Sequence, residues 1–185
     1  MMITLVIMAM LGLMSWRGLD GLIRGKERID EYNRQQREVN YALTLLDRDC
    51  NAMLSTEVFG GPVVTINNQG VWWIRSLGIS DQPGWQMVGY HVNEDGLHRL
   101  ISGPFVNRES AFEAWQIFLK DSTKLPTQLD TQSLSTAIRR QDVITLSDVP
   151  GSTTPVKAVK FVWQVVVNDP NADRALTRVC LAGGV

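Results

Sequence analysis

The sequence predicts an α+β fold, in which a long N-terminal helix packs on a β-rich domain of antiparallel hairpins. Two observations predict it. Residues 1–16 form an apolar run that continues, without a turn signal, into about forty residues of helical periodicity. Beyond Leu54 the apolar pattern alternates instead, and Gly60, Gly61 and Pro62 mark the change. We therefore divide the chain into a helix over 1–57 and a β-rich domain over 58–185.

The composition is typical of a folded chain and argues against nucleic-acid binding. The 185 residues are 44% hydrophobic and 20% charged, as in a globular domain. The net charge is −1, and no dense block of Lys and Arg is present, which argues against nucleic-acid binding. The sequence contains no nucleophile elbow, phosphate loop or CxxC motif. No motif therefore indicates a catalytic chemistry, a cofactor or a small-molecule substrate.

The apolar N-terminal segment, about residues 1–22, is predicted to be a membrane helix. Sixteen residues of helix span ~24 Å, which is less than the ~30 Å hydrocarbon core of a bilayer. The segment lacks the basic start and the cleavage site of a secretory signal. The residues assigned to the membrane are Ile3, Leu5, Val6, Ile7, Leu11, Leu13 and Trp16.

The first charged residues follow the apolar run, and their position conflicts with export of the domain that follows. By the positive-inside rule, Arg17, Arg24, Lys26 and Arg28 hold the following domain in the cytoplasm. Basic residues before the run would reverse this orientation. A reporter fused after Val185 that works only in the cytoplasm would support the cytoplasmic alternative.

The helix carries an apolar stripe with alternating steps of three and four residues, which is the heptad pattern. From Val39 to Met53 the simpler interpretation is packing on the chain's own domain. The preceding stretch, 17–36, is sparse in apolar residues, and we expect it to pack against copies or relatives of itself. The residues assigned to helix packing are Val39, Leu43, Leu46 and Met53.

Three β-hairpins are predicted in the second part of the chain. The first pairs 63–67 with 71–77, and the second pairs 85–92 with 97–102 around a turn in which Gly96 takes a positive φ. The third pairs 156–167 with 176–181.

The region between the second and third hairpins is predicted to be partly helical. A short amphipathic helix fits 109–119, with Asn107 as its N-cap. A helical turn over 133–140 and a short strand over 143–146 follow. The side chains expected on the inward face of the 109–119 helix are Phe112, Trp115, Phe118 and Leu119.

The two cysteines permit one pairing. Cys50 lies on the helix stripe and Cys180 in the last predicted strand, so both can face the seam between helix and sheet. A disulfide here would stabilise the fold by roughly 4 kcal/mol through the closure of a long loop. Two buried free thiols are the alternative.

Adjacent tryptophans stand out as candidates for partner contact. Trp72 and Trp73 lie side by side in a predicted strand, where neighbouring side chains point to opposite faces. We expect one of the two to reach the surface and to contact a partner.

Two sets of metal-ligating residue types are judged not to be metal sites. Asp169, Asn171 and Asp173 imitate the opening of a calcium-binding loop, but the rest of that pattern fails and a turn explains them. His91 and His98 flank a hairpin turn without a nearby carboxylate or cysteine. We expect both to be surface histidines.

Three stretches resemble the type IV pilin-like family, and within it the J-type minor pseudopilins of bacterial type II secretion. The stretch 3–22, ITLVIMAMLGLMSWRGLDGL, resembles the family's membrane helix. The stretch 42–49, ALTLLDRD, is similar to the end of its first helix. The hairpin 90–99, with Asp95, Gly96, Leu97 and Arg99, is similar to one that J-type proteins carry.

The resemblance implies a filament subunit without enzymatic activity. Such a subunit lies in the bacterial inner membrane as a single-pass protein with its C-terminal domain in the periplasm. It then packs, helix to helix, with other pseudopilins at the tip of a filament that aids protein export. A minor pilin of a type IV pilus is the close alternative, and a membrane-anchored periplasmic enzyme or sensor domain is the alternative from another class.

The family pattern also predicts that the N-terminus is incomplete. Members begin with a basic leader, a Gly at the cleavage point, then Phe-Thr-Leu and a Glu, none of which precedes the apolar run here. When the apolar run is aligned with that of the family, the leader and about the first seven residues after its cleavage point are expected to be missing. In-frame DNA upstream of Met1 that encodes these residues would support the family, and an upstream stop codon would argue against it.

Overall fold

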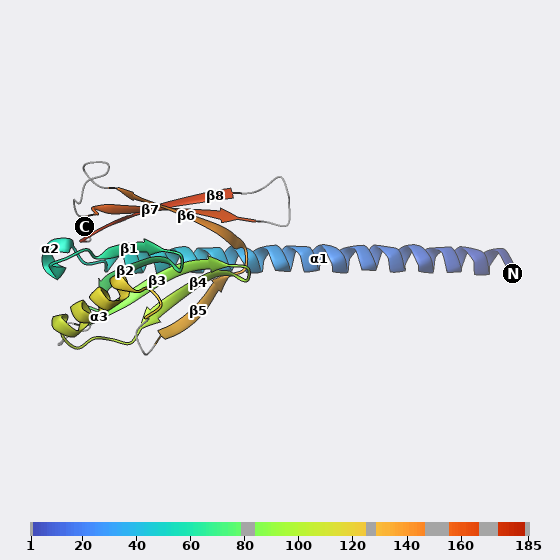
Figure 1. Ribbon diagram of the computed structural model, residues 1–185. Coiled ribbons are helices and arrows are strands. Elements are labelled where there is room, and N and C mark those ends of the chain that lie inside the picture. The colour runs from blue at the N-terminus through green and yellow to red at the C-terminus, as the bar shows by residue number, and fades with distance from the viewer. Residues whose placement is uncertain (1, 79–83, 125–128, 147–155, 167–173, 184–185) are drawn as a thin grey trace. The chain divides into compact units, whose positions relative to one another are not determined.

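The computed structural model describes residues 2–78, 84–124, 129–146, 156–166 and 174–183 (Figure 1). Helix α1 spans Met2–Asn51. The contacts divide the chain into two compact units, Met1–Arg37 and Glu38–Val185, which are described separately. The helix ends before the predicted limit at Glu57, because residues 52–54 turn away and hydrogen-bond with a strand, Leu54 N donating to Ile74 O.

The unit Met1–Arg37 is helical and exposes apolar side chains among charged ones. Ion pairs at helical spacing, Asp20 with Arg24 and Glu31 with Arg34, lie on its surface. Among the predicted membrane residues, Ile3 and Trp16 are exposed, and the side chains of Leu5, Val6, Ile7, Leu11 and Leu13 lie outside the described part. Within the described residues, no helix has the length and apolar character needed to cross a membrane.

The unit Glu38–Val185 contains a five-stranded antiparallel sheet in the order β1-β2-β3-β4-β5. Its first two predicted hairpins are confirmed. Gly96 has φ +122° at the turn of the second, and a Cβ there would meet the backbone of Ser135. The strands are β1 Val64–Asn67, β2 Gly70–Ser76, β3 Trp85–Asn93, β4 Gly96–Ser102 and β5 Leu129–Ser135.

A second, three-stranded sheet has the order β6-β7-β8, with β6 Ile138–Leu146, β7 Ala158–Val165 and β8 Arg174–Leu181. The β7–β8 pairing confirms the third predicted hairpin. The calcium-loop candidates Asp169, Asn171 and Asp173 lie outside the described residues.

The helical turn predicted over 133–140 is wrong. This stretch contains the end of β5, a bend, and the start of β6. Leu134, Ala137 and Ile138 are buried, as a helix would also require, but they lie in β5, in the bend and in β6, respectively. Pairing of β5 with β4 and of β6 with β7 overrides the weak helical spacing.

Two short helices complete this unit. Helix α2, Thr56–Phe59, is capped by Ser55, and α3, Arg108–Lys120, is capped by Asn107, whose side chain accepts from Ser110 N at 2.8 Å. The predicted helix and its N-cap are thus confirmed. Trp115 and Phe118 of α3 are buried, while Phe112 and Leu119 are partly buried against the core.

The prediction that Trp72 or Trp73 reaches the surface is wrong, because both faces of the five-stranded sheet are covered. The exposed fractions are 1% and 0%. Trp72 contacts Phe118 of α3, with ring centroids 5.0 Å apart. Trp73 stacks on Tyr90 and meets Phe161 of β7 on the other face. Neither ring is available to a partner.

Gly89 makes room for the Trp72 ring. The two residues are cross-strand partners, and a Cβ on Gly89 would lie 2.5 Å from the indole. We expect Gly89→Ala to lower the free energy of unfolding by about 1–3 kcal/mol, because the buried ring must move in a close-packed core. Urea unfolding followed by tryptophan fluorescence measures it.

Gly25→Ala is the control for this prediction. Apart from the helix's own backbone and the adjacent residues, nothing in the described part of the chain lies within 4 Å of a Cβ at that helical position, so the free energy of unfolding should stay the same or rise. Equal unfolding midpoints for the Gly89→Ala variant and the unmodified chain would contradict this prediction, because the Trp72 ring would then move without a loss of stability.

Candidate functional site

A buried carboxylate on the last turns of α1 is the main polar feature of the interior. Asp49 is fully buried and receives hydrogen bonds from three strands of the five-stranded sheet. Arg99 donates through Nε to Oδ2 at 2.6 Å and through Nη2 to Oδ1 at 2.9 Å. Tyr90 donates its hydroxyl to Oδ2 at 2.8 Å, and Arg75 donates Nη1 to Oδ1. We call these four residues the Asp49 cluster.

Strand register places the partners of Asp49 around it. Tyr90 and Arg99 are cross-strand neighbours on β3 and β4, so their side chains rise from the same face. Arg75 is opposite Gln86, to whose Oε1 it donates, and Gln86 in turn donates to Ser102 O at 2.7 Å. The Arg75 guanidinium is thereby held in place by a second layer of hydrogen bonds.

Burial and the Asp49 charge together set the protonation of the cluster. Burial lowers the pKa of Arg75, against the attraction of Asp49. Burial also lowers the pKa of Arg99, but the hydrogen bonds and the charge of Asp49 outweigh this effect, so the pKa of Arg99 is raised. Burial and the Asp49 carboxylate raise the pKa of Tyr90, so its hydroxyl stays a donor. The cluster is a set of fixed hydrogen bonds.

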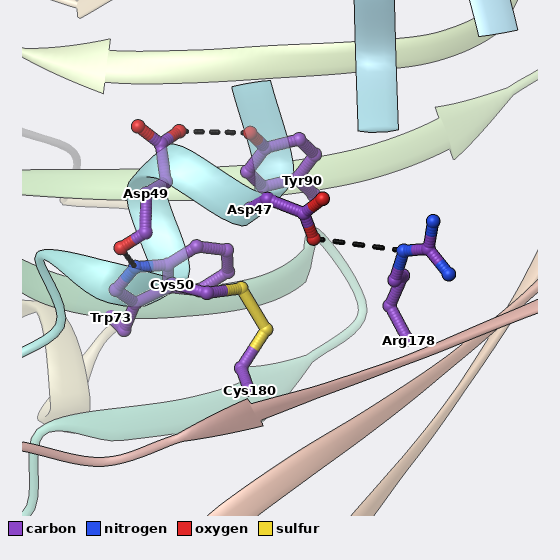
Figure 2. Close-up of a disulfide and its surroundings, with 7 residues drawn as sticks. All are labelled: Asp47, Asp49, Cys50, Trp73, Tyr90, Arg178 and Cys180. Atoms are coloured by element: carbon purple, nitrogen blue, oxygen red, sulfur yellow. Dashed lines mark hydrogen bonds and ion pairs between the residues drawn. A yellow bond between two sulfur atoms is a disulfide. The ribbon is translucent and has the colours of Figure 1, made fainter. Parts of the chain in front are cut away.

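The neighbouring residue, Cys50, forms a disulfide with Cys180 of β8 (Figure 2). Their Cα atoms are 5.1 Å apart, and 130 residues separate them in the chain. Of the two arrangements that the sequence left open, the structure therefore has the bridge. Asp47 also reaches β8, by an ion pair with Arg178 at 3.6 Å. The last turns of α1 are thus attached to both sheets.

The helix-packing prediction is confirmed for the end of α1. Val39 and Leu46 are buried in the core, and Leu43 packs partly buried against it. Met53 is also buried, but it lies beyond the end of α1 at Asn51, so it is not a helix-packing residue. This part of the stripe is intramolecular, as the simpler interpretation held. The sequence reasoning missed that Asp49 would be buried. The signal was a carboxylate directly beside Cys50 on the apolar stripe.

His91 and His98 are directly opposite each other on β3 and β4, and both are partly exposed. Burial and the charge of His98 lower the pKa of His91. In the described part of the chain, no group of three or more His, Cys, Asp or Glu side chains is placed to hold a metal ion.

The fold and the Asp49 cluster define a class of α+β protein in which a long N-terminal helix is fastened by its last turns to antiparallel β-sheets. The comparison with known sequences adds no narrower assignment. No protein-family model matches the chain, and no curated protein matches it significantly.

Proposed function

We propose that this chain is a filament subunit that packs through its N-terminal helix, of the minor pseudopilin type found in type II secretion. The observation that carries the proposal is the exposure of apolar side chains along the helix within Met1–Arg37. A helix with so many uncovered apolar residues is stabilised when other helices or lipid cover them. The exposed residues include Met14, Trp16, Leu19, Leu22, Ile23, Ile29 and Tyr32.

The attachment of the helix end supports a mechanical role. Residues 47–50 hold both sheets through the Asp49 cluster, the disulfide and the pair of Asp47 with Arg178. A force on the end of the helix is therefore transmitted to covalent and charge-assisted bonds rather than to apolar contacts alone. A subunit that is extracted from a membrane or pushed along a filament needs such an attachment.

The proposed location is the bacterial inner membrane, with residues 1–22 in the bilayer and the β-rich domain in the periplasm. The Cys50–Cys180 disulfide supports an oxidising compartment for the domain. The proposed partners are other pseudopilins, which would contact the exposed part of the helix.

The test is a charge placed on the exposed apolar stripe. We expect Ile29→Lys to abolish co-purification of the tagged chain with the proposed pseudopilin partners, because a helix–helix contact would have to bury the ammonium group. The melting temperature of the chain should not change, since Ile29 is 62% exposed.

Gln35→Lys is the matched control. It adds the same charge on another side of the helix, where the new ammonium group can pair with Glu31 at the i,i+4 spacing. Co-purification should survive this change. Loss of co-purification in both variants would point to a general charge effect, and its retention in Ile29→Lys would contradict packing through this stripe.

A further inference from the structure

A polar pocket of about 310 Å³ lies in the unit Glu38–Val185, outside the Asp49 cluster. It is formed where the β1–β2 turn, β3 and the beginning of β6 meet. No acidic residue is among the described residues that line it. Its polar lining is Asn67, Asn68, His91, Arg139, Arg140 and Gln141.

An irregularity in β6 brings two consecutive arginines to this pocket. In a regular strand, neighbouring side chains point to opposite faces, so Arg139 and Arg140 would be separated. The β6–β7 pairing instead shifts register between Ile138 and Arg140. Such a bulge redirects a side chain, and both arginines line the pocket as a result.

Hydrogen bonds hold the pocket wall in position. Gln141 donates through Nε2 to Tyr90 O at 3.2 Å and accepts from Trp163 Nε1 at 2.9 Å, so β6 is fixed against β3. Arg139 donates Nη1 to Glu94 O. Arg140 donates Nε to Asp142 Oδ1 at 3.2 Å. A guanidinium has five N–H donors, so both arginines keep donors for a ligand.

We propose that this pocket is an oxyanion-binding site that takes the carboxylates of an acidic segment of a partner protein. The guanidinium fork matches the two oxygens of a carboxylate, and the side-chain amides of Asn67 and Asn68 add donors. The proposal concerns a surface separate from the N-terminal helix, so it does not depend on filament assembly.

The exposure of the arginines favours a segment over a free ion. The side chain of Arg140 is 65% exposed, and Asp142 beside it reduces the local positive charge. Water and salt weaken the attraction of such a site for a single small anion. Several carboxylates on one chain bind together, because each one bound raises the effective concentration of the next.

The test uses a fluorescent hexaglutamate peptide and the full chain, with binding measured by fluorescence anisotropy at low salt. We expect saturable binding that weakens about tenfold or more when Arg139→Gln and Arg140→Gln are combined, because charge-assisted hydrogen bonds are lost. Asn68→Asp, a change of an exposed residue that places a carboxylate in the lining, should also weaken it.

Arg174→Gln is the control. It removes an exposed arginine of β8 that does not line the pocket, and it should leave the affinity for the peptide within about twofold. Equal losses in the control and the double variant would overturn the site, as would unchanged binding in the double variant. Inorganic phosphate should displace the peptide only at much higher concentration. Phosphate binding tighter than the peptide would overturn the assignment to an acidic segment.

Discussion

Replacing Asp49 with Asn is expected to lower the free energy of unfolding by about 3–5 kcal/mol, because it leaves Arg75 and Arg99 buried without a counter-charge. The amide keeps the shape of the carboxylate, so the loss comes from charge and hydrogen bonding rather than from a cavity. Urea unfolding of the full chain in mild detergent, with the disulfide intact and tryptophan fluorescence as the signal, measures the change.

Asp47→Asn is the matched control, since it removes the same charge two positions earlier in the helix. Its ion pair with Arg178 is 3.6 Å long and about half exposed, so the change should cost less than about 1 kcal/mol. Tyr90→Phe provides a graded variant that loses one hydrogen bond to Asp49, at about 1–1.5 kcal/mol. Equal midpoints for Asp49→Asn and Asp47→Asn would contradict the role given to the Asp49 cluster.

Removal of the disulfide is expected to have an effect of similar size. The disulfide closes a loop between two residues that are 130 positions apart in the chain. In the double variant Cys50→Ala, Cys180→Ala, the unfolded chain regains the conformational entropy that this loop closure removes. The chain-entropy model gives about 4–5 kcal/mol for a loop of this length. Thermal unfolding should therefore occur at a clearly lower temperature in the variant than in the oxidised chain.

Reductant separates the effect of the bond from the effect of packing. Dithiothreitol should lower the unfolding temperature of the unmodified chain and leave that of the double variant unchanged. Because Cys50 and Cys180 are buried at 6% and 1% exposure, reduction should require partial unfolding and proceed slowly below the transition. A chain whose unfolding temperature does not respond to complete reduction would show that the bond contributes nothing to stability.

Local signals were sufficient for most of the secondary structure. The hairpins were predictable because Asn and Gly at their turns have strong conformational preferences that act over a few residues, and Asn67 and Asn93 do accept hydrogen bonds from the second residue after them. The N-cap of α3 is local in the same way. The region 133–140 was not predictable, because its spacing of apolar residues fits a helix and a bent strand equally well.

The candidate sites depended on contacts that no local pattern contains. The apolar stripe indicated that Leu46 and Met53 would be buried, but it did not indicate that Asp49 would join them with Arg75 and Arg99 as partners. The pocket with Arg139 and Arg140 depends on a bulge, which changes the direction of a side chain without a clear change in the sequence pattern. One of Trp72 and Trp73 was expected at the surface because nothing in their strand predicted that both faces of the sheet would be covered.

The sequence by itself determined that the chain has a long N-terminal helix and a domain of antiparallel hairpins, with one cysteine in the helix and one in the last strand, because periodicity and turn residues act over short distances. Only the tertiary structure decided that Cys50 and Cys180 are bonded and that both faces of the five-stranded sheet are covered. It also decided that Asp49 is paired with two arginines. These facts depend on strand register and on contacts between residues far apart in the chain, which the chain acquires only when the sheets form around the end of α1.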